Sequence, residues 1–310
     1  MTRQFLYALC ITLFTVSAAM GSDGLGAKLI DATEAGNLSK IEELLEQGAN
    51  VNATSKGMQT PLMFAATEDH MEAAKLLLGK GANIHSRTDD GWTALFCAAS
   101  GSHIEMTNLL IEHGADVNSP TRTGATALHK AAEKNQLKII QILLERGANP
   151  NSKNNKGYTP LMLASEKGHS DAVSSLLFAQ ANVNQQDIYG ASALMKTAAK
   201  GHPDIVQQLL ASGADAHQKD LDGATALHWA AEFGHTKVIA ELLQQGIDIN
   251  SINDEGWTAL TESANGSHLE AVQYLLKHGA DKTLTDTNGS TALDYARMRG
   301  DIAVMTLLSD

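Results

Sequence analysis

A short motif returns along this chain at a constant spacing of 33 residues, and no other feature restricts the fold as strongly. The motif is threonine or serine, then alanine or proline, then leucine, and it begins at Thr60, Thr93, Thr126, Thr159, Ser192, Thr225, Thr258 and Thr291. A glycine keeps the same period at Gly48, Gly81, Gly114, Gly147, Gly213, Gly246 and Gly279, with Gln180 in the missing place. Self-similarity at this period predicts a solenoid of stacked, equivalent units.

Each unit carries the start and stop signals of two helices. The threonine of the motif suits a helix N-cap, and Pro61 and Pro160 take the first helical position in two units. Gly234 and its equivalents predict a left-handed end to the first helix, and paired leucines mark the buried stripe of the second. Gln180 is expected to be strained by about 1 kcal/mol, because a side chain is unfavourable in the left-handed region.

The full pattern is G-x-T-[AP]-L-x-x-A, then G-H, then L-L-x-x-G-A-[ND]-x-N, and it resembles the ankyrin-repeat family from about Leu25 to Asp310. The resemblance implies an all-α solenoid, an array of paired antiparallel helices joined by β-hairpin fingers. It implies about nine repeats including the caps, within one domain over residues 22–310.

The first residues differ in character from the repeats. An uncharged apolar run extends from Phe5 to Met20, after Arg3 as the only charge, and small residues follow it. This pattern predicts a signal peptide over residues 1–21, removed near Ala19 or Gly21. An uncleaved anchor is the alternative, but the run is short for a membrane span. We therefore expect a periplasmic or secreted protein with no stable membrane insertion after cleavage.

The overall charge and the cysteine count exclude several classes of protein. A formal net charge of −12 disfavours binding to nucleic acid, whose phosphates would repel the chain. The two cysteines, Cys10 and Cys97, do not form a disulfide framework. Cys97 with His103 could be imagined as a nucleophile and base, but a lone cysteine at a variable repeat position is more simply a small packing residue.

One stretch, Gly223 to His235, looks like a metal site when it is read alone, because His228, Glu232 and His235 share a helix. The repeat period argues against this interpretation. Twelve histidines fall on four recurring repeat positions, whereas a catalytic or metal site normally occurs once. The family resemblance implies that the histidine after T-x-L and the histidine after the turn glycine are structural and bond backbone or threonine groups between repeats. We expect no metal, no cofactor and no catalytic residue, and hydrolase or redox motifs are absent from the sequence.

A solenoid binds partners with the residues that its fold does not need, here the finger tips and the inner face of the first helix. All three tryptophans fall at such positions, and five lysines lie at them in three central repeats. Aromatic residues are the usual interface anchors. The predicted partner-binding residues are Trp92, Lys130, Lys134, Tyr158, Lys167, Lys196, Lys200, Trp229, Phe233 and Trp257.

These residues predict a non-enzymatic, monomeric scaffold that binds a protein partner with an acidic surface. The chain resembles the signal-peptide-bearing ankyrin proteins of Gram-negative bacteria, which implies a periplasmic role. Two alternatives stay open from the sequence: a secreted effector that binds a host protein, and, from a different class, a hydrolase or redox enzyme. A further possibility for the lysines is that they only keep exposed helix positions soluble.

Overall fold

The computed structural model describes residues 24–309, and every regular element in that range is an α-helix. The predicted signal peptide over residues 1–21 lies outside the described residues. The chain divides into two compact units, Met1–Arg122 and Thr123–Asp310, and each is described below by itself. Within the described range, no helix is both long and apolar enough to cross a bilayer.

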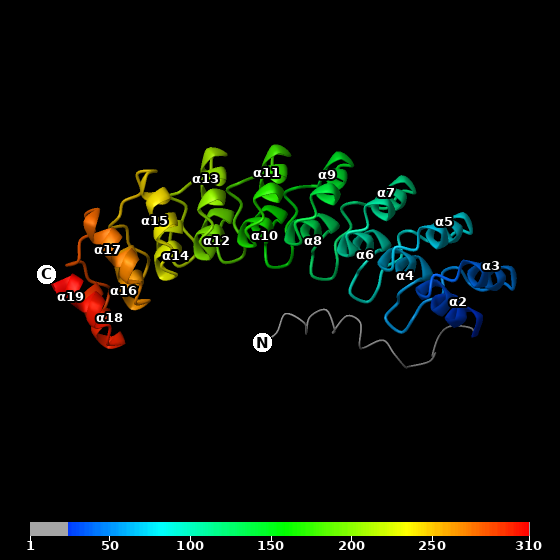
Figure 1. The fold of residues 1–310 in the computed structure, drawn as a ribbon, viewed down its shortest axis with the longest axis horizontal. Helices are drawn as coiled ribbons and strands as arrows, with labels where there is room; N and C mark the ends of the chain where they lie inside the picture. Colours follow the sequence, from blue (N-terminus) through cyan, green and yellow to red (C-terminus); the bar gives the residue numbers. More distant parts are fainter. Residues whose placement is uncertain (1–23, 310) are drawn as a thin grey trace. The chain divides into compact units, whose positions relative to one another are not determined.

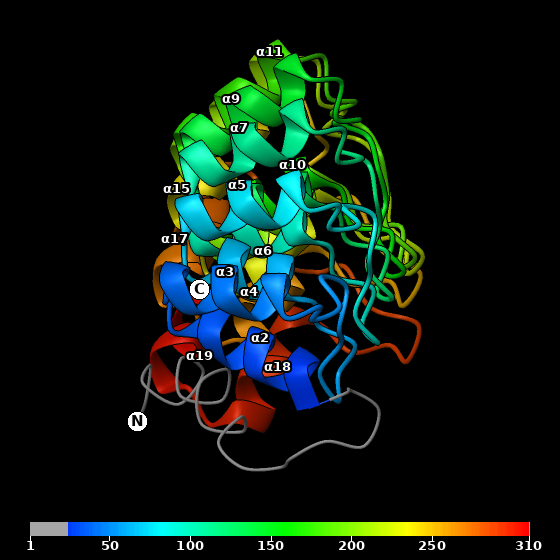
Figure 2. The same cartoon turned by 90° about the vertical axis from the view of Figure 1, so that its right-hand side faces the viewer.

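The first unit consists of three pairs of helices that stack in chain order. The first member of each pair packs on the first member of the next, as α2 packs on α4 and α4 on α6. The loops before α4 and α6 project to one side of these pairs (Figure 2). The helices are α2 (Gly24–Glu34), α3 (Leu38–Glu46), α4 (Pro61–Thr67), α5 (Met71–Gly79), α6 (Ala94–Gly101) and α7 (Ile104–Glu112).

The second unit continues the same pairing and has two layers. Inner helices pack on inner helices and outer helices on outer helices, in chain order (Figure 1). The inner layer is α8 (Ala127–Glu133), α10 (Pro160–Glu166), α12 (Ala193–Lys200), α14 (Ala226–Glu232), α16 (Ala259–Asn265) and α18 (Ala292–Arg299). The outer layer is α9 (Leu137–Glu145), α11 (Ser170–Phe178), α13 (Pro203–Ala211), α15 (Thr236–Leu243), α17 (Leu269–Lys277) and α19 (Ile302–Ser309).

Small and aliphatic side chains fill the space between these helices. In α14, Leu227, Ala230 and Ala231 are fully buried, and Leu242 of α15 is buried against them. The alanines allow inner helices to approach closely, because a longer side chain at these positions would hold neighbouring repeats apart. The repeated leucine and alanine positions of the sequence are therefore the core of each unit.

The predicted threonine or serine cap is confirmed in most repeats, while the Thr126 and Thr225 hydroxyls contact His129 and His228 instead. The Thr159 hydroxyl accepts a hydrogen bond from the backbone N–H of Met162, and Ser192 accepts one from Met195 in the same way. Gly234 adopts φ +70°, the left-handed conformation that the sequence predicts after α14. Gln180 takes up the same region with φ +60°, so the expected strain falls on a residue with a side chain.

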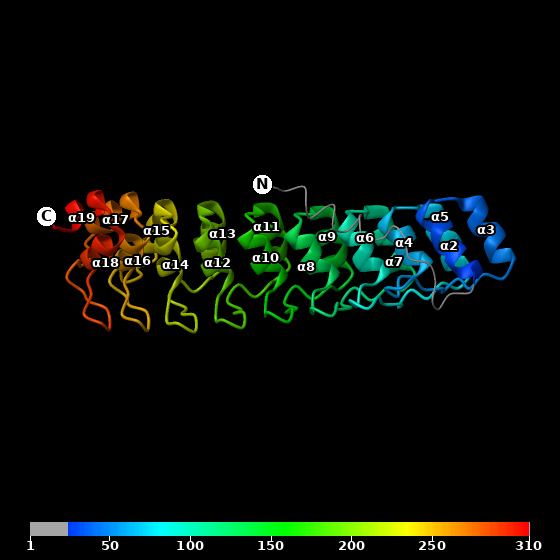
Figure 3. The ribbon, with the colours of Figure 1, turned by 90° about the horizontal axis from the view of Figure 1, so that it is seen from below.

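The loops before the inner helices differ from the β-hairpins that the family resemblance implied. They project together on one side of the second unit (Figure 3), but residues 24–309 form no strand. The loop before α12 is closed by a backbone hydrogen bond from Asp187 to Ala191 of 3.0 Å. Isolated bridges occur only at Gln186 with Ser192 and at Thr285 with Thr291 within the described chain. The arms are too short for a ladder, because Gly190 turns the chain at φ +78° within a few residues.

Successive loops instead bond to one another. The backbone N–H of Leu221 donates to the carbonyl of Tyr189 at 3.0 Å, and that of Ile188 donates to Lys156 at 3.2 Å. Glycine is required at this turn, since a Cβ on Gly190 would lie 2.8 Å from the backbone nitrogen of Leu221. The loops of the second unit are therefore held in register with one another as well as with their own helices.

Candidate binding surface

His129 and His228, at the same repeat position, join neighbouring repeats. Nδ1 of His228 accepts a hydrogen bond from the backbone N–H of Thr225 at 3.2 Å, and Nε2 lies 3.1 Å from the carbonyl of Trp257 in the next repeat. His129 makes the equivalent contacts with Thr126 and Tyr158. Burial lowers the pKa of both rings, which favours the neutral imidazole that can accept and donate at once.

A second histidine series bonds to the ends of inner helices. Nε2 of His268 lies 2.8 Å from the carbonyl of Glu232, and Nε2 of His235 lies 3.1 Å from that of Ala199. These contacts give His129, His228, His235 and His268 the structural role that was predicted for their repeat positions. Within residues 24–309, no group of three or more potential ligands is arranged to hold a metal ion.

Cys97 is buried in α6, and its burial raises the pKa of the thiol to about 11. A thiol with this pKa is almost entirely protonated at neutral pH and is therefore a poor nucleophile. The packing interpretation of Cys97 fits this environment better than the nucleophile interpretation does.

The five lysines of the predicted stripe do not share one environment. Lys167 and Lys200 are exposed at the C-terminal ends of α10 and α12, and Lys134 is exposed at the end of α8. We call these three residues the lysine row. Lys130 is half-buried and donates to Glu133 at 2.8 Å, so its charge is already balanced.

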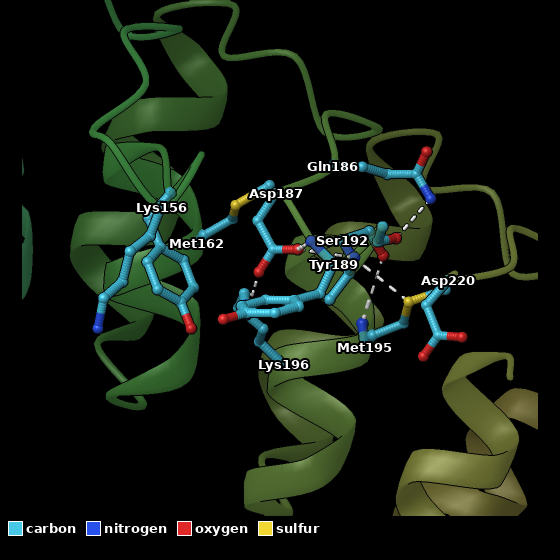
Figure 4. Close-up of polar contacts among 12 residues, drawn as sticks. Lys156, Met162, Gln186, Asp187, Tyr189, Ser192, Met195, Lys196 and Asp220 are labelled. Atoms are coloured by element: carbon cyan, nitrogen blue, oxygen red, sulfur yellow. Dashed lines mark hydrogen bonds and ion pairs between the residues drawn. The ribbon is translucent and has the colours of Figure 1, made fainter. Parts of the chain in front are cut away.

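Lys196 corrects the sequence-based prediction most clearly. Its side chain is only 6% exposed, and its ammonium lies 2.8 Å from Oδ2 of Asp187, whose side chain is fully buried. The same ammonium lies 4.0 Å from the centre of the Tyr158 ring. Figure 4 shows Asp187 pointing from its loop toward Lys196 on α12. Lys196 is therefore a core residue of its repeat and does not belong to an exposed stripe.

Asp187 also organises its own loop. Its Oδ1 accepts hydrogen bonds of 2.9 Å from the backbone N–H groups of Tyr189 and Ala191, while Oδ2 faces Lys196. One carboxylate thus closes the turn and fixes an inner-helix side chain.

The same arrangement recurs in two further repeats with different donors. Nε1 of Trp229 donates to Oδ2 of Asp220 at 2.7 Å, and the hydroxyl of Tyr295 donates to Oδ2 of Asp286 at 2.5 Å. The hydrogen bond to Asp286 is the main reason that the pKa of Tyr295 rises to about 12. Sequence reasoning missed this pairing, although a visible signal exists: an aspartate stands nine positions before Lys196, Trp229 and Tyr295 alike.

The remaining predicted aromatic residues are at least partly exposed. Phe233 is 47% exposed at the end of α14. Trp257 is partly exposed, and its ring centre lies 4.6 Å from that of Tyr295. Trp92 belongs to the first unit, where its ring centre lies 5.1 Å from that of Phe96. Trp229, Phe233 and Trp257 therefore share the second unit, and Trp92 is described apart from them.

Three glutamates of the second unit, Glu232, Glu255 and Glu262, act on one another. Burial, together with the charges of Glu232 and Glu255, raises the pKa of Glu262 on α16 to about 8. Burial also raises the pKa of Glu232 on α14. The inner helices α14 and α16 therefore combine aromatic and acidic side chains, whereas α8, α10 and α12 end in the lysine row.

Comparison with protein families shows what kind of array this is. The family model described as ankyrin repeats in three copies matches residues 29–121, 119–187, 161–253, 194–286 and 250–310. No curated protein is similar enough to the chain to count as a match. The matched segments cover nearly all of the helical repeats, and the chain belongs to the ankyrin-repeat family.

Proposed function

We propose that the chain is a non-enzymatic scaffold that binds a partner protein along the inner helix face and the adjoining loops of its second unit. Ankyrin repeats are protein-interaction modules, which supports a partner protein. The observation that carries the location is the presence of exposed side chains that the repeat packing does not use. Lys167, Lys200 and Phe233 are exposed on consecutive inner helices.

The lysine row would steer an acidic surface of the partner toward α10 and α12. Each lysine lies at a helix C-terminus, where the helix dipole already favours a cation, so the charges are well placed without a partner. Charges at the rim of an interface mainly change the association rate and its salt dependence. Phe233 would contribute affinity, since a desolvated aromatic anchor can be worth about 2 kcal/mol.

The lysine row and Phe233 are expected to affect binding kinetics differently. A partner captured on the mature chain would be tested against a Lys167→Glu, Lys200→Glu variant and against Phe233→Ala. The lysine variant should associate more slowly and lose salt dependence, while Phe233→Ala should dissociate faster with its salt dependence unchanged. Surface plasmon resonance at several salt concentrations measures both rates.

A matched control has the same change of charge on the outer layer. Lys237 of α15 and Lys277 of α17 are exposed there, so reversing both to glutamate should leave the association rate near that of the wild type. A partner that binds the inner-face variants as tightly as the wild type would place the binding surface elsewhere.

We further propose that the scaffold acts after export, with residues 1–21 removed, and the apolar run from Phe5 to Met20 supports this. Intact-mass measurement of protein from its source cells is expected to give a chain that begins near Met20, Gly21 or Ser22. A chain found in the cytosol that still begins at Met1 or Thr2 would contradict export.

A further inference from the structure

Glu262 stands apart from the residues at the equivalent position of the other inner helices. In α12, α14 and α18 this position holds Lys196, Trp229 and Tyr295, and each bonds to an aspartate in the loop before its helix. In the repeat of Glu262 the loop residue is Asn253. Its Oδ1 already accepts from the backbone N–H groups of Glu255 at 3.0 Å and Trp257 at 2.9 Å.

The charges around Glu262 are unbalanced. Glu232 and Glu255 both act on it with like charge, and in residues 24–309 none of these three carboxylates has an ion pair. On α18, Arg297 pairs with Asp294, and Arg299 donates to the neutral amide oxygen of Asn265 at the end of α16. No cation is among the charges that act on Glu262, so a positive group placed beside it would complement all three carboxylates.

Aromatic rings in fixed positions occur in the repeat of Glu262 and on the two inner helices that pack on α16. The ring of Trp257 packs at 4.6 Å against that of Tyr295, and Tyr295 is held by its hydrogen bond to Asp286. Trp229 occupies the position of Glu262 on the preceding inner helix and is held by Asp220. Since α16 packs on both α14 and α18, Glu262 is flanked by an aromatic residue on either side. Ring faces attract cations, and the attraction grows when water is excluded.

We propose that Glu232, Glu255 and Glu262, with Trp229, Trp257 and Tyr295, form a docking surface for a basic segment of the partner, which inserts an arginine or lysine side chain against Glu262. This inference rests on the proposed scaffold function. It adds a basic segment to the acidic surface that the lysine row requires of the partner. A segment that fits both ends of the inner face has acidic residues over the lysine row and a basic residue over α16. At neutral pH the cation would displace the proton of Glu262 into solvent, because only the carboxylate can form the ion pair.

The test uses the mature chain and two capped dipeptides, acetyl-phenylalanyl-arginine amide and its citrulline counterpart. Citrulline has nearly the shape of arginine without the charge, so the comparison isolates the cation. Tryptophan fluorescence and calorimetry at pH 7 are expected to show at least tenfold tighter binding of the arginine peptide. Calorimetry in two buffers with different ionisation heats should show proton release with arginine only.

Two variants decide whether Glu262 is responsible. Glu262→Gln should remove both the preference for arginine and the proton release. Glu270→Gln, on the exposed side of outer helix α17, should retain both. Equal affinity for the two peptides, or a preference that survives Glu262→Gln, would overturn the proposal. Because the titration needs no partner protein, its result is independent of the capture experiment that tests the scaffold function.

Discussion

Replacement of Lys196 by alanine is expected to destabilise the protein by about 3–5 kcal/mol, because it leaves the buried carboxylate of Asp187 without its counter-ion. The side chain of Asp187 is fully buried, so water cannot replace the lost ammonium. Urea unfolding of the mature chain at pH 7 measures the change. Lys200→Ala is the matched control on the same helix, and an exposed lysine should cost about 0.5 kcal/mol or less.

A double variant separates the ion pair from the packing. The preceding repeat has Asn154 and Leu163 at the positions of Asp187 and Lys196, and Oδ1 of Asn154 closes its loop in the same way. Asp187→Asn with Lys196→Leu copies that natural combination and should recover most of the lost stability. If the free energy of unfolding of Lys196→Ala is within about 1 kcal/mol of the wild-type value, the ion pair does not have the energetic role that its burial implies.

The contribution of Glu262 to stability is expected to fall as the pH rises from about 4.5 to 8. Its pKa is about 8 in the folded chain against 4.5 for an ordinary glutamate, so the folded state holds a proton that the unfolded state has released. The stabilising difference is fully present below pH 4.5 and is lost through this window, by roughly 3 kcal/mol at pH 7. Glu232 shifts in the same direction.

The buried histidines oppose this trend on the acid side. The pKa values of His129 and His228 are lowered in the folded chain, so the unfolded state gains protons first as the pH falls below 6.5. Stability then drops toward lower pH. The wild-type profile is the sum of these opposing contributions, with the histidines acting below pH 6.5 and the glutamates alone above it, and urea midpoints from pH 5 to pH 9 trace it.

Glu262→Gln should remove most of the alkaline limb and raise the stability at pH 7 to 8. The acid limb should remain, because both histidines are unchanged. Glu270→Gln, whose side chain is exposed, should follow the wild-type curve. If the urea midpoints of Glu262→Gln and of the wild type change in parallel with pH above pH 6, Glu262 is ionised in the folded chain. That result would contradict this account.

The repeat architecture was readable from the sequence because its causes are local or strictly periodic. A cap threonine bonds to a residue three positions later, as Thr159 does with Met162, and a glycine such as Gly234 ends a helix by its own backbone conformation. The structural role of His228 was predictable for the same reason, since its partners recur at constant offsets from it. These relations do not depend on which surface faces solvent.

The character of the binding surface depended on tertiary structure. Lys130, Lys196 and Lys200 look alike in the sequence, yet one pairs with Glu133, one is buried against Asp187 and one is exposed. The difference arises because a loop carboxylate reaches Lys196 only when the chain has folded.

Glu262 shows the same limit for an acidic residue. Its own stretch of sequence does not reveal that two more carboxylates act on it. Glu232 stands thirty positions earlier, and Glu255 lies in the loop before α16. Sequence alone determined the repeats, the caps and the histidine contacts, since each follows from fixed offsets along the chain. Tertiary structure decided which charged side chains are buried in ion pairs and which are exposed, because burial and long-range proximity set the free energy of a charge.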